Sequence, residues 1–289
     1  MMQFDLFRIH VFETPQKPLP YGDGPDARPR ILGEIFESLP EAQFKVGGTW
    51  HIANSERIPD TDTAFYMKVG RTQERVREVF LDSAFRRVTI PEADTSHVFL
   101  NISSELLAVS GNPRLGSGEK IANSFIRLLM ASPRSVELEA VLKVDAIPDP
   151  RDLIQHIRSA YSISKLWIEI PRKNAHNNKK ILFDPVQEAA ERFHFDKVRL
   201  EFIESQLARD DLTKDEIAEL IAEATTIGGR AGGRIKEGKK SRPRNVSTGK
   251  AALKAQVEDV GPETDRSEKR RRLESIEALV ARARQGKSG

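Results

Sequence analysis

Residues 136–144 alternate apolar and polar side chains, which is the pattern of a strand with one buried face. Asp149 then stands at an N-cap position before a proline, and apolar residues recur at helical spacing as far as Tyr161. Alternation returns at 166–170. This order predicts a central β-α-β unit over residues 136–170, with the helix as a crossover between two strands of one sheet.

Weaker patterns extend this fold on both sides. We expect strands at 4–12, 44–52, 65–69, 98–102, 106–109 and 198–202, and helices at 29–39, 121–129, 185–194 and 213–224. Residues 75–90 fit either a helix and a strand or two strands, and their β-branched content favours two strands. The predicted fold class is therefore α+β or mixed α/β, with a mixed sheet and flanking helices.

Changes in composition divide the chain into four parts. Residues 1–110 are expected to be mostly β with one helix, and residues 111–227 to form an α/β part that contains the β-α-β unit. These two parts form either one continuous domain or two. Residues 228–262 are a basic, glycine-rich arm, either an edge hairpin or a flexible segment, and residues 263–289 form an amphipathic C-terminal helix.

Composition excludes several kinds of chemistry. The chain has 289 residues, 38% of them hydrophobic, which is enough for a sizeable core. It contains no cysteine, and this excludes disulfides, thiolate nucleophiles and cysteine-bound metal sites. Because no apolar run of membrane-spanning length and no secretory signal is visible, we expect a cytoplasmic protein that does not enter a membrane.

Charge is distributed unevenly along the chain. The formal net charge is +3, but residues 228–289 carry 17 Lys or Arg against 8 Asp or Glu, a net of +9. Residues 1–227 carry 29 against 35, a net of −6. A basic segment attached to an acidic body points to contact with a polyanion, or to a segment that is simply solvated.

This asymmetry predicts a non-enzymatic nucleic-acid-binding protein, with DNA favoured over RNA, that contacts phosphates through the basic arm. A basic loop at the C-terminal end of the 166–170 strand is a second phosphate-binding candidate, and Trp167 either stacks on a base or packs under a neighbouring helix. Such a body with a basic tail is typical of bacterial accessory proteins of phage-defence or mobile-element systems. The candidate residues are Arg230, Arg234, Lys236, Lys239, Lys240, Arg242, Arg244 and Lys250 in the arm, and Arg172, Lys173, Lys179 and Lys180 in the loop.

Two other functions remain open. Leu273, Ile276, Val280 and Ala283 form an apolar stripe on the C-terminal helix, which suits an assembly subunit that forms homo-oligomers or binds a partner protein through residues 263–284. A metal-dependent nuclease is the third possibility. The six histidines show no HxH or HxxxH spacing, so the sequence indicates no catalytic residues, no metal site and no cofactor.

Overall fold

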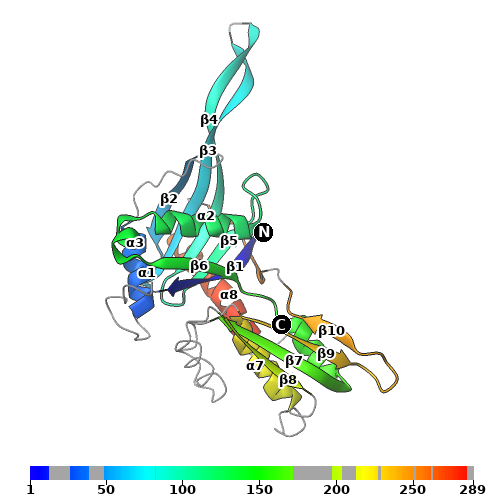
Figure 1. The fold of residues 1–289 in the computed structure, drawn as a ribbon. Coiled ribbons are helices and arrows are strands. Elements are labelled where there is room, and N and C mark those ends of the chain that lie inside the picture. Colours follow the sequence, from blue (N-terminus) through cyan, green and yellow to red (C-terminus); the bar gives the residue numbers. More distant parts are fainter. Residues whose placement is uncertain are drawn as a thin grey trace. The chain divides into compact units, whose positions relative to one another are not determined.

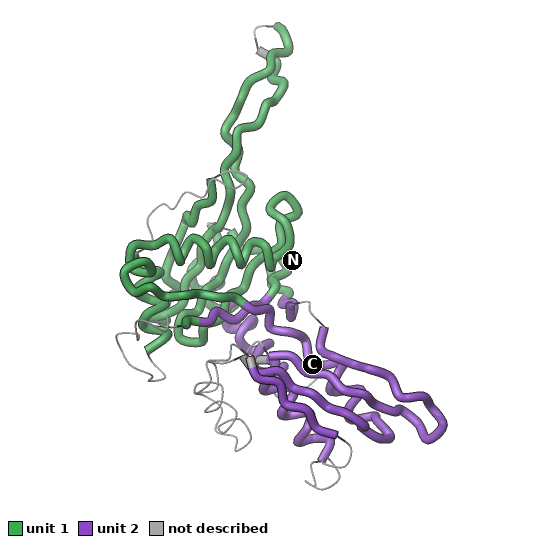
Figure 2. Tube along the Cα trace, viewed as in Figure 1, with its two compact units in different colours: residues 1–5, 11–144, 256–272 green, residues 6–10, 145–255, 273–289 purple. Residues whose placement is uncertain are grey.

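The computed structural model describes residues 1–12, 27–38, 49–81, 83–171, 197–203, 213–226, 229–249, 252–261 and 263–284. The chain divides into two compact units, which are described separately (Figure 2). Unit 1 comprises residues 1–5, 11–144 and 256–272, and unit 2 comprises residues 6–10, 145–255 and 273–289.

The larger sheet has seven strands in the order β11-β1-β5-β4-β3-β2, with β6 beside β1 (Figure 1). Its strands are β1 (Met2–Phe12), β2 (Thr49–Arg57), β3 (Ala64–Leu81), β4 (Ala84–Asn101), β5 (Leu106–Ser110), β6 (Val141–Ala146) and β11 (Lys254–Val257). From β2 to β5, each strand pairs antiparallel with the next in the chain. Three strands, β1, β6 and β11, contribute residues to both units.

The alternating patterns located most of these strands. Strands expected at 4–12, 98–102 and 106–109 are confirmed, and the run at 65–69 is the beginning of the much longer β3. Residues 75–90 form two strands, as their β-branched content predicted, and they belong to a single long hairpin made by β3 and β4. Residues 39–48, which include most of the strand expected at 44–52, lie outside the described residues.

Three helices belong to unit 1: α1 (Ala27–Glu37), α2 (Gly118–Met130) and α3 (Pro133–Leu138). The side chain of Ser117 caps α2 by accepting a hydrogen bond from the backbone N–H of Lys120, at 3.3 Å. Ile121, Phe125 and Leu129 recur on one face of α2 and are fully buried, so the helix expected at 121–129 is confirmed.

An ion pair between Glu56 of β2 and the buried Lys269 lies on one face of the large sheet. In β2 a β-bulge between Ala53 and Glu56 changes which face the following side chains occupy, and Asn54 takes the left-handed conformation, with φ 53°. Glu56 then pairs with Lys269, whose side chain is only 2% exposed. The ammonium of Lys269 also lies 4.6 Å from the ring centroid of Tyr66. Burial, followed by the charge of Glu56, raises the pKa of Tyr66 to about 12.

A histidine in the same unit is expected to make its stability depend on pH. Nδ1 of His97 lies 2.7 Å from the hydroxyl oxygen of Tyr66, and the two groups share a hydrogen bond. Burial, then the nearby charge of Lys68, lowers the pKa of His97 below its ordinary value. Because the unfolded chain takes up the proton first, stability should fall as the pH drops through 6.5 towards the lower, folded-state pKa. Urea unfolding followed between pH 7.5 and 5 checks this, and a His97→Gln variant should lose part of the slope.

Unit 2 contains a second, four-stranded antiparallel sheet in the order β10-β9-β7-β8. Helix α4 (Arg151–Ser159) precedes β7 (Ser162–Pro171) and β8 (Lys197–Ile203), and helix α7 (Lys214–Thr226) precedes β9 (Arg230–Lys236) and β10 (Arg244–Ser247). Among the described residues, a helix followed by two strands therefore occurs twice, and the central strands β7 and β9 run antiparallel. The two helices and one face of the sheet share an apolar core that includes Ile157, Ile168, Ile221 and Ile235.

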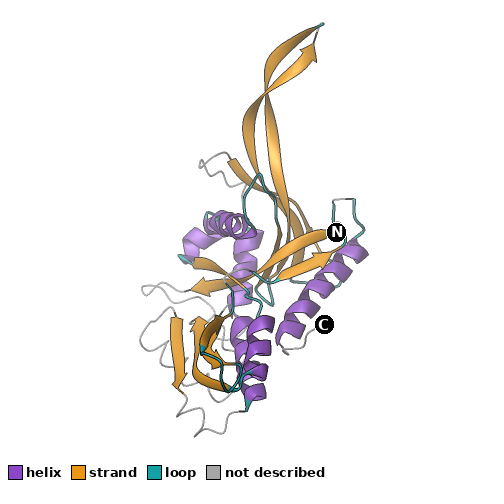
Figure 3. Cartoon of the chain, turned by 90° about the vertical axis from the view of Figure 1, so that its right-hand side faces the viewer, coloured by secondary structure: helices purple, strands orange, loops and turns teal. Residues whose placement is uncertain are grey.

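The predicted α+β or mixed α/β fold with a central β-α-β unit is wrong. Strand residues outnumber helical ones in the described part of the chain. The pairs β2–β3, β3–β4, β4–β5, β7–β8, β7–β9 and β9–β10 are all antiparallel, and most helices lie outside the sheets (Figure 3). The alternation at 136–144 misled because Ser132 caps a helix with Pro133 at its first position, so residues 133–138 form α3 and Val136 is 65% exposed. The strand begins only at Val141, and its sheet is not the one that contains β7.

The C-terminal quarter is more regular than its composition indicates. Residues 229–249 form the hairpin of β9 and β10, so the arm expected at 228–262 is an edge hairpin over this stretch rather than a flexible segment. The C-terminal helix is confirmed as α8 (Arg266–Arg284).

The capping box before α7 is confirmed as well, because the Thr213 N–H donates to Glu216 at 2.7 Å and the Glu216 N–H donates back to the Thr213 hydroxyl at 3.2 Å. The helix expected at 185–194 lies outside the described residues.

Candidate nucleic-acid interface

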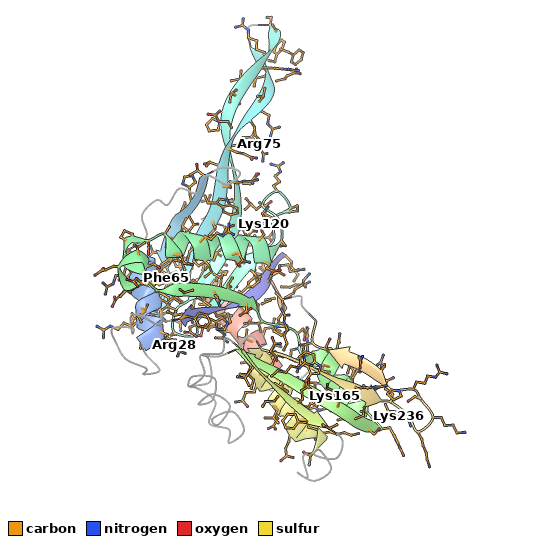
Figure 4. The ribbon with its side chains drawn as sticks, in the orientation of Figure 1. Arg28, Phe65, Arg75, Lys120, Lys165 and Lys236 are labelled. Carbon is orange, nitrogen blue, oxygen red and sulfur yellow. The ribbon has the colours of Figure 1, made fainter. Side chains whose placement is uncertain are left out.

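The β9–β10 hairpin, residues 229–249, brings together seven of the twelve candidate residues. Arg230, Arg234 and Lys236 lie on β9, Lys239, Lys240 and Arg242 lie in the connection between the strands, and Arg244 begins β10. The other five candidates, Lys250, Arg172, Lys173, Lys179 and Lys180, lie outside the described residues. Figure 4 labels Lys236 at the end of β9 and Lys165 on the neighbouring strand β7.

The side chains of β9 alternate between the buried face and the outer face of the sheet, and the buried ones anchor the hairpin. Ala231 and Ile235 are fully buried, whereas Arg234 is exposed on the opposite face. Gly232 lies against Trp167, and a Cβ atom there would be 2.5 Å from Cζ2 of the indole and 2.8 Å from the carbonyl oxygen of Val246. Gly232, in the glycine-rich stretch, therefore permits β9 to lie close to Trp167 and to β10.

The connection between the strands holds its cations away from the sheet. Ser241 ties the turn together, since its hydroxyl accepts from the Gly238 N–H at 2.8 Å and its own N–H donates to the Gly238 carbonyl at 3.0 Å. Lys239, Lys240 and Arg242 are exposed around this turn, and no described carboxylate forms an ion pair with them.

Arg244 behaves differently from its neighbours. Its guanidinium donates to Glu237 and to Nδ1 of His156, at 3.0 Å in the second case. Glu237 is the only acidic residue between 229 and 249. Since Arg244 already occupies this carboxylate, the other six cations of the hairpin have no acidic side chain of their own hairpin to neutralise them.

The outer face of β7 and β8 is more balanced in charge. Glu201 accepts from Lys165 at 2.8 Å and from Arg199 at 3.0 Å, and the hydrogen bond from Lys165 lowers the pKa of Glu201, which keeps it ionised at neutral pH. The Arg199 guanidinium also lies over the indole of Trp167, 4.5 Å from the ring centroid. Trp167, the base-stacking candidate of the sequence analysis, thus already has a planar cation on its ring.

Tyr161 is the aromatic residue that the sequence analysis misplaced. Its spacing put it on the buried face of the helix, but α4 ends at Ser159 and Tyr161 is 58% exposed. Its N–H donates to the carbonyl of Lys236 at 2.7 Å, and the ammonium of Lys236 lies 6.0 Å from its ring centroid. An exposed ring therefore stands beside the end of β9, where a base can stack. The β-branched Ile163, two residues further on, was the signal available in the sequence that a strand begins close to Tyr161.

A second group of arginines lies in unit 1 and has different surroundings. Arg75, Arg77 and Arg114 line a surface hollow beside Val76. Glu92 accepts from Arg77 at 2.6 Å and from Arg75 at 3.2 Å, and the largely buried Asp94 accepts from Arg75 at 2.5 Å. These guanidinium groups are already matched by carboxylates, so the hollow is a weaker phosphate candidate than the β9–β10 hairpin.

Comparison with known proteins provides no functional assignment: no protein-family model matches the chain, and a search of curated proteins found no significant match. Among the described residues, no helix is long and apolar enough to cross a membrane. Nor does the described part of the chain gather three or more His, Asp or Glu side chains in a metal-binding group, so the nuclease hypothesis gains no support from it.

Proposed function

We propose that this protein binds nucleic acid through the β9–β10 hairpin, by contacts to the phosphate backbone. One observation carries the proposal: residues 229–249 contain seven Lys or Arg and one acidic residue, and that residue is engaged by Arg244. Lysine and arginine side chains without a carboxylate partner can neutralise the phosphates of a nucleic acid. The counterions that are then released from the nucleic acid favour binding.

The arrangement suits affinity more than sequence recognition. Lys239, Lys240 and Arg242 are exposed around the turn, and Arg234 is exposed on the outer face of β9. Long flexible cations of this kind contact phosphate oxygens, which are the same for every base. Tyr161 adds a ring surface that accepts any base, and this favours single-stranded or unpaired nucleotides next to the hairpin. The preference for DNA over RNA remains a prediction from sequence.

Salt dependence is the direct test of this proposal. Replacing Lys239, Lys240 and Arg242 with alanine removes three phosphate contacts, so the slope of log K against log salt should become shallower by about 2.7 for duplex DNA. Fluorescence anisotropy with labelled DNA and RNA at 50–300 mM salt measures this slope.

A control of equal charge separates the hairpin from net charge alone. Lys120, Arg127 and Lys254 are exposed and lie outside the hairpin, so their triple alanine variant should keep a slope close to wild type. The proposal fails if both triple variants lose the same slope, or if the hairpin variant keeps it.

The assembly alternative receives less support at the residues that suggested it. Leu273, Ile276 and Ala283 of α8 are each at most 3% exposed within the chain, so most of the apolar stripe is already covered. Oligomer formation through residues 263–284 therefore remains a prediction without a specific observation in its favour.

A further inference from the structure

The outer part of the β3–β4 hairpin is a two-stranded ribbon. Among the described residues, β2 pairs with β3 only as far as Thr72, and β5 pairs with β4 only from Val98 onward. Beyond Thr72 the two long strands continue alone, from the pair Gln73–Glu92 to the pair Leu81–Ala84. At about 3.4 Å per residue, these nine cross-strand pairs extend for about 30 Å. Residues 73–92 are called the ribbon below, and they project from the sheet of unit 1 in Figures 1 and 3.

Among the described side chains of the ribbon, the large exposed apolar ones lie on one of its faces. Val76, Glu78 and Phe80 alternate with residues of the opposite face, and their cross-strand partners are Thr89, Arg87 and Phe85. Val76 is 64% exposed, Phe80 62% and Phe85 77%. The two phenylalanines contact each other edge to face, with ring centroids 5.3 Å apart. A cluster of exposed aromatic side chains at the end of an otherwise polar element indicates a docking surface.

The charges of the ribbon argue against a polyanion as the partner. Residues 73–92 contain four arginines and four acidic residues, a net charge of zero. Glu78 pairs with Arg87 at 3.6 Å, and Glu92 accepts from Arg77 at 2.6 Å. That hydrogen bond lowers the pKa of Glu92, so its carboxylate is charged at neutral pH. Phosphates would have to displace these carboxylates, which they need not do at the β9–β10 hairpin.

We propose that the partner of this face is the same face of a second copy of the chain. Glu78 lies directly opposite Arg87, and Phe80 directly opposite Phe85, so the face carries its own complement across the two strands. A two-fold axis along the ribbon sets β3 of one copy against β4 of the other. Glu78 then meets Arg87 of the second copy, and Phe80 meets Phe85 of the second copy.

The charge pattern also selects this symmetry over the alternative one. A two-fold axis across the ribbon would set each strand against itself in the reverse direction, and an axis through the Glu78–Arg87 pair would set Glu78 against Glu78 and Arg87 against Arg87. Like charges directly opposite each other are destabilising, so the ribbons associate in parallel with their aromatic ends together. A ribbon face of this size buries less than the roughly 1,600 Å² of a standard interface, and we therefore expect a concentration-dependent dimer.

Sedimentation velocity on the full chain over a concentration series tests the dimer. The wild-type sedimentation coefficient should rise with concentration, and the Phe80→Ser, Phe85→Ser double variant should stay monomeric throughout. Val88→Thr is the matched control, because Val88 lies on the opposite face of the same ribbon, and it should behave like wild type. Circular dichroism verifies that all variants remain folded.

A mixing experiment separates contact between copies from folding of the ribbon. Glu78→Arg alone and Arg87→Glu alone each place like charges both within one ribbon and between two identical copies, so each should be monomeric. Mixed together, the two variants restore opposite charges between the copies but not within either ribbon. A heterodimer, seen by native mass spectrometry or energy transfer, can therefore come only from an intermolecular pair.

Three outcomes would overturn the inference. A wild-type protein that stays monomeric into the high-micromolar range has no such dimer. A dimer that survives the double serine variant uses another surface. If the double variant instead weakens binding of labelled DNA while the wild type remains monomeric, the ribbon is part of the nucleic-acid interface. None of these outcomes depends on the salt slope of the β9–β10 hairpin, which tests the proposed function separately.

Discussion

Replacing Glu56 with glutamine is expected to lower the free energy of unfolding by about 3–5 kcal/mol, because it removes the negative charge paired with the buried ammonium of Lys269. Lys269 is 2% exposed, and Glu56 forms the ion pair with it on the sheet face that also contains Tyr66. Glutamine keeps the shape and one accepting oxygen but removes the charge. Urea unfolding monitored by circular dichroism measures the loss.

The reverse substitution is the informative control. Lys269→Met leaves behind a carboxylate that is 25% exposed and can contact water, so it should cost clearly less than Glu56→Gln. In the double variant neither charge of the Glu56–Lys269 pair remains, and its stability should lie near that of Lys269→Met alone. Equal losses in both single variants would contradict the view that the buried ammonium is the vulnerable partner.

Strand positions were largely readable from the sequence because side-chain alternation depends on local geometry alone. The runs at 98–102, 106–109 and 198–202, and the capping box at Thr213 and Glu216, each correspond to an observed element. Alternation indicates which face is buried but does not identify the neighbouring strand. The residues of β6 and β7 therefore looked like one β-α-β unit, although these strands belong to different sheets.

The candidate site was only partly readable, because charge pairing depends on cross-strand register. The sequence showed many cations at 230–254, but not that Glu237 is taken by Arg244 and leaves the turn cations without it. The arginines of the ribbon were not singled out at all, and cross-strand register explains their neutralisation. Glu78 lies opposite Arg87, and Glu92, opposite Gln73, lies two pairs from Arg75 on the same face. Exposure of Phe80 and Phe85 was equally hidden, since phenylalanine in a strand usually marks a core.

The glycines of the hairpin show the same limit most clearly, and they lead to the second large effect. Gly232→Ala is expected to destabilise unit 2 by about 3 kcal/mol, the upper end of the usual range for overpacking, because the new Cβ would meet the indole of Trp167 and the carbonyl of Val246. The indole cannot move aside without losing its contact with Arg199. Displacing β9 should also lower nucleic-acid affinity, although no charged residue is changed.

Gly238→Ala provides the matched control in the same hairpin. A Cβ there has only the Ser241 hydroxyl oxygen within 4 Å, at 3.8 Å, so both stability and affinity should stay close to wild type. Because the chain has two tryptophans, Trp50 in β2 and Trp167 in β7, a Trp50→Phe background leaves fluorescence that reports on unit 2 alone. If Gly232→Ala unfolds in that background at the same urea concentration as Gly238→Ala, then β9 is not held against Trp167, and the hairpin that presents the cations is looser than its contacts indicate.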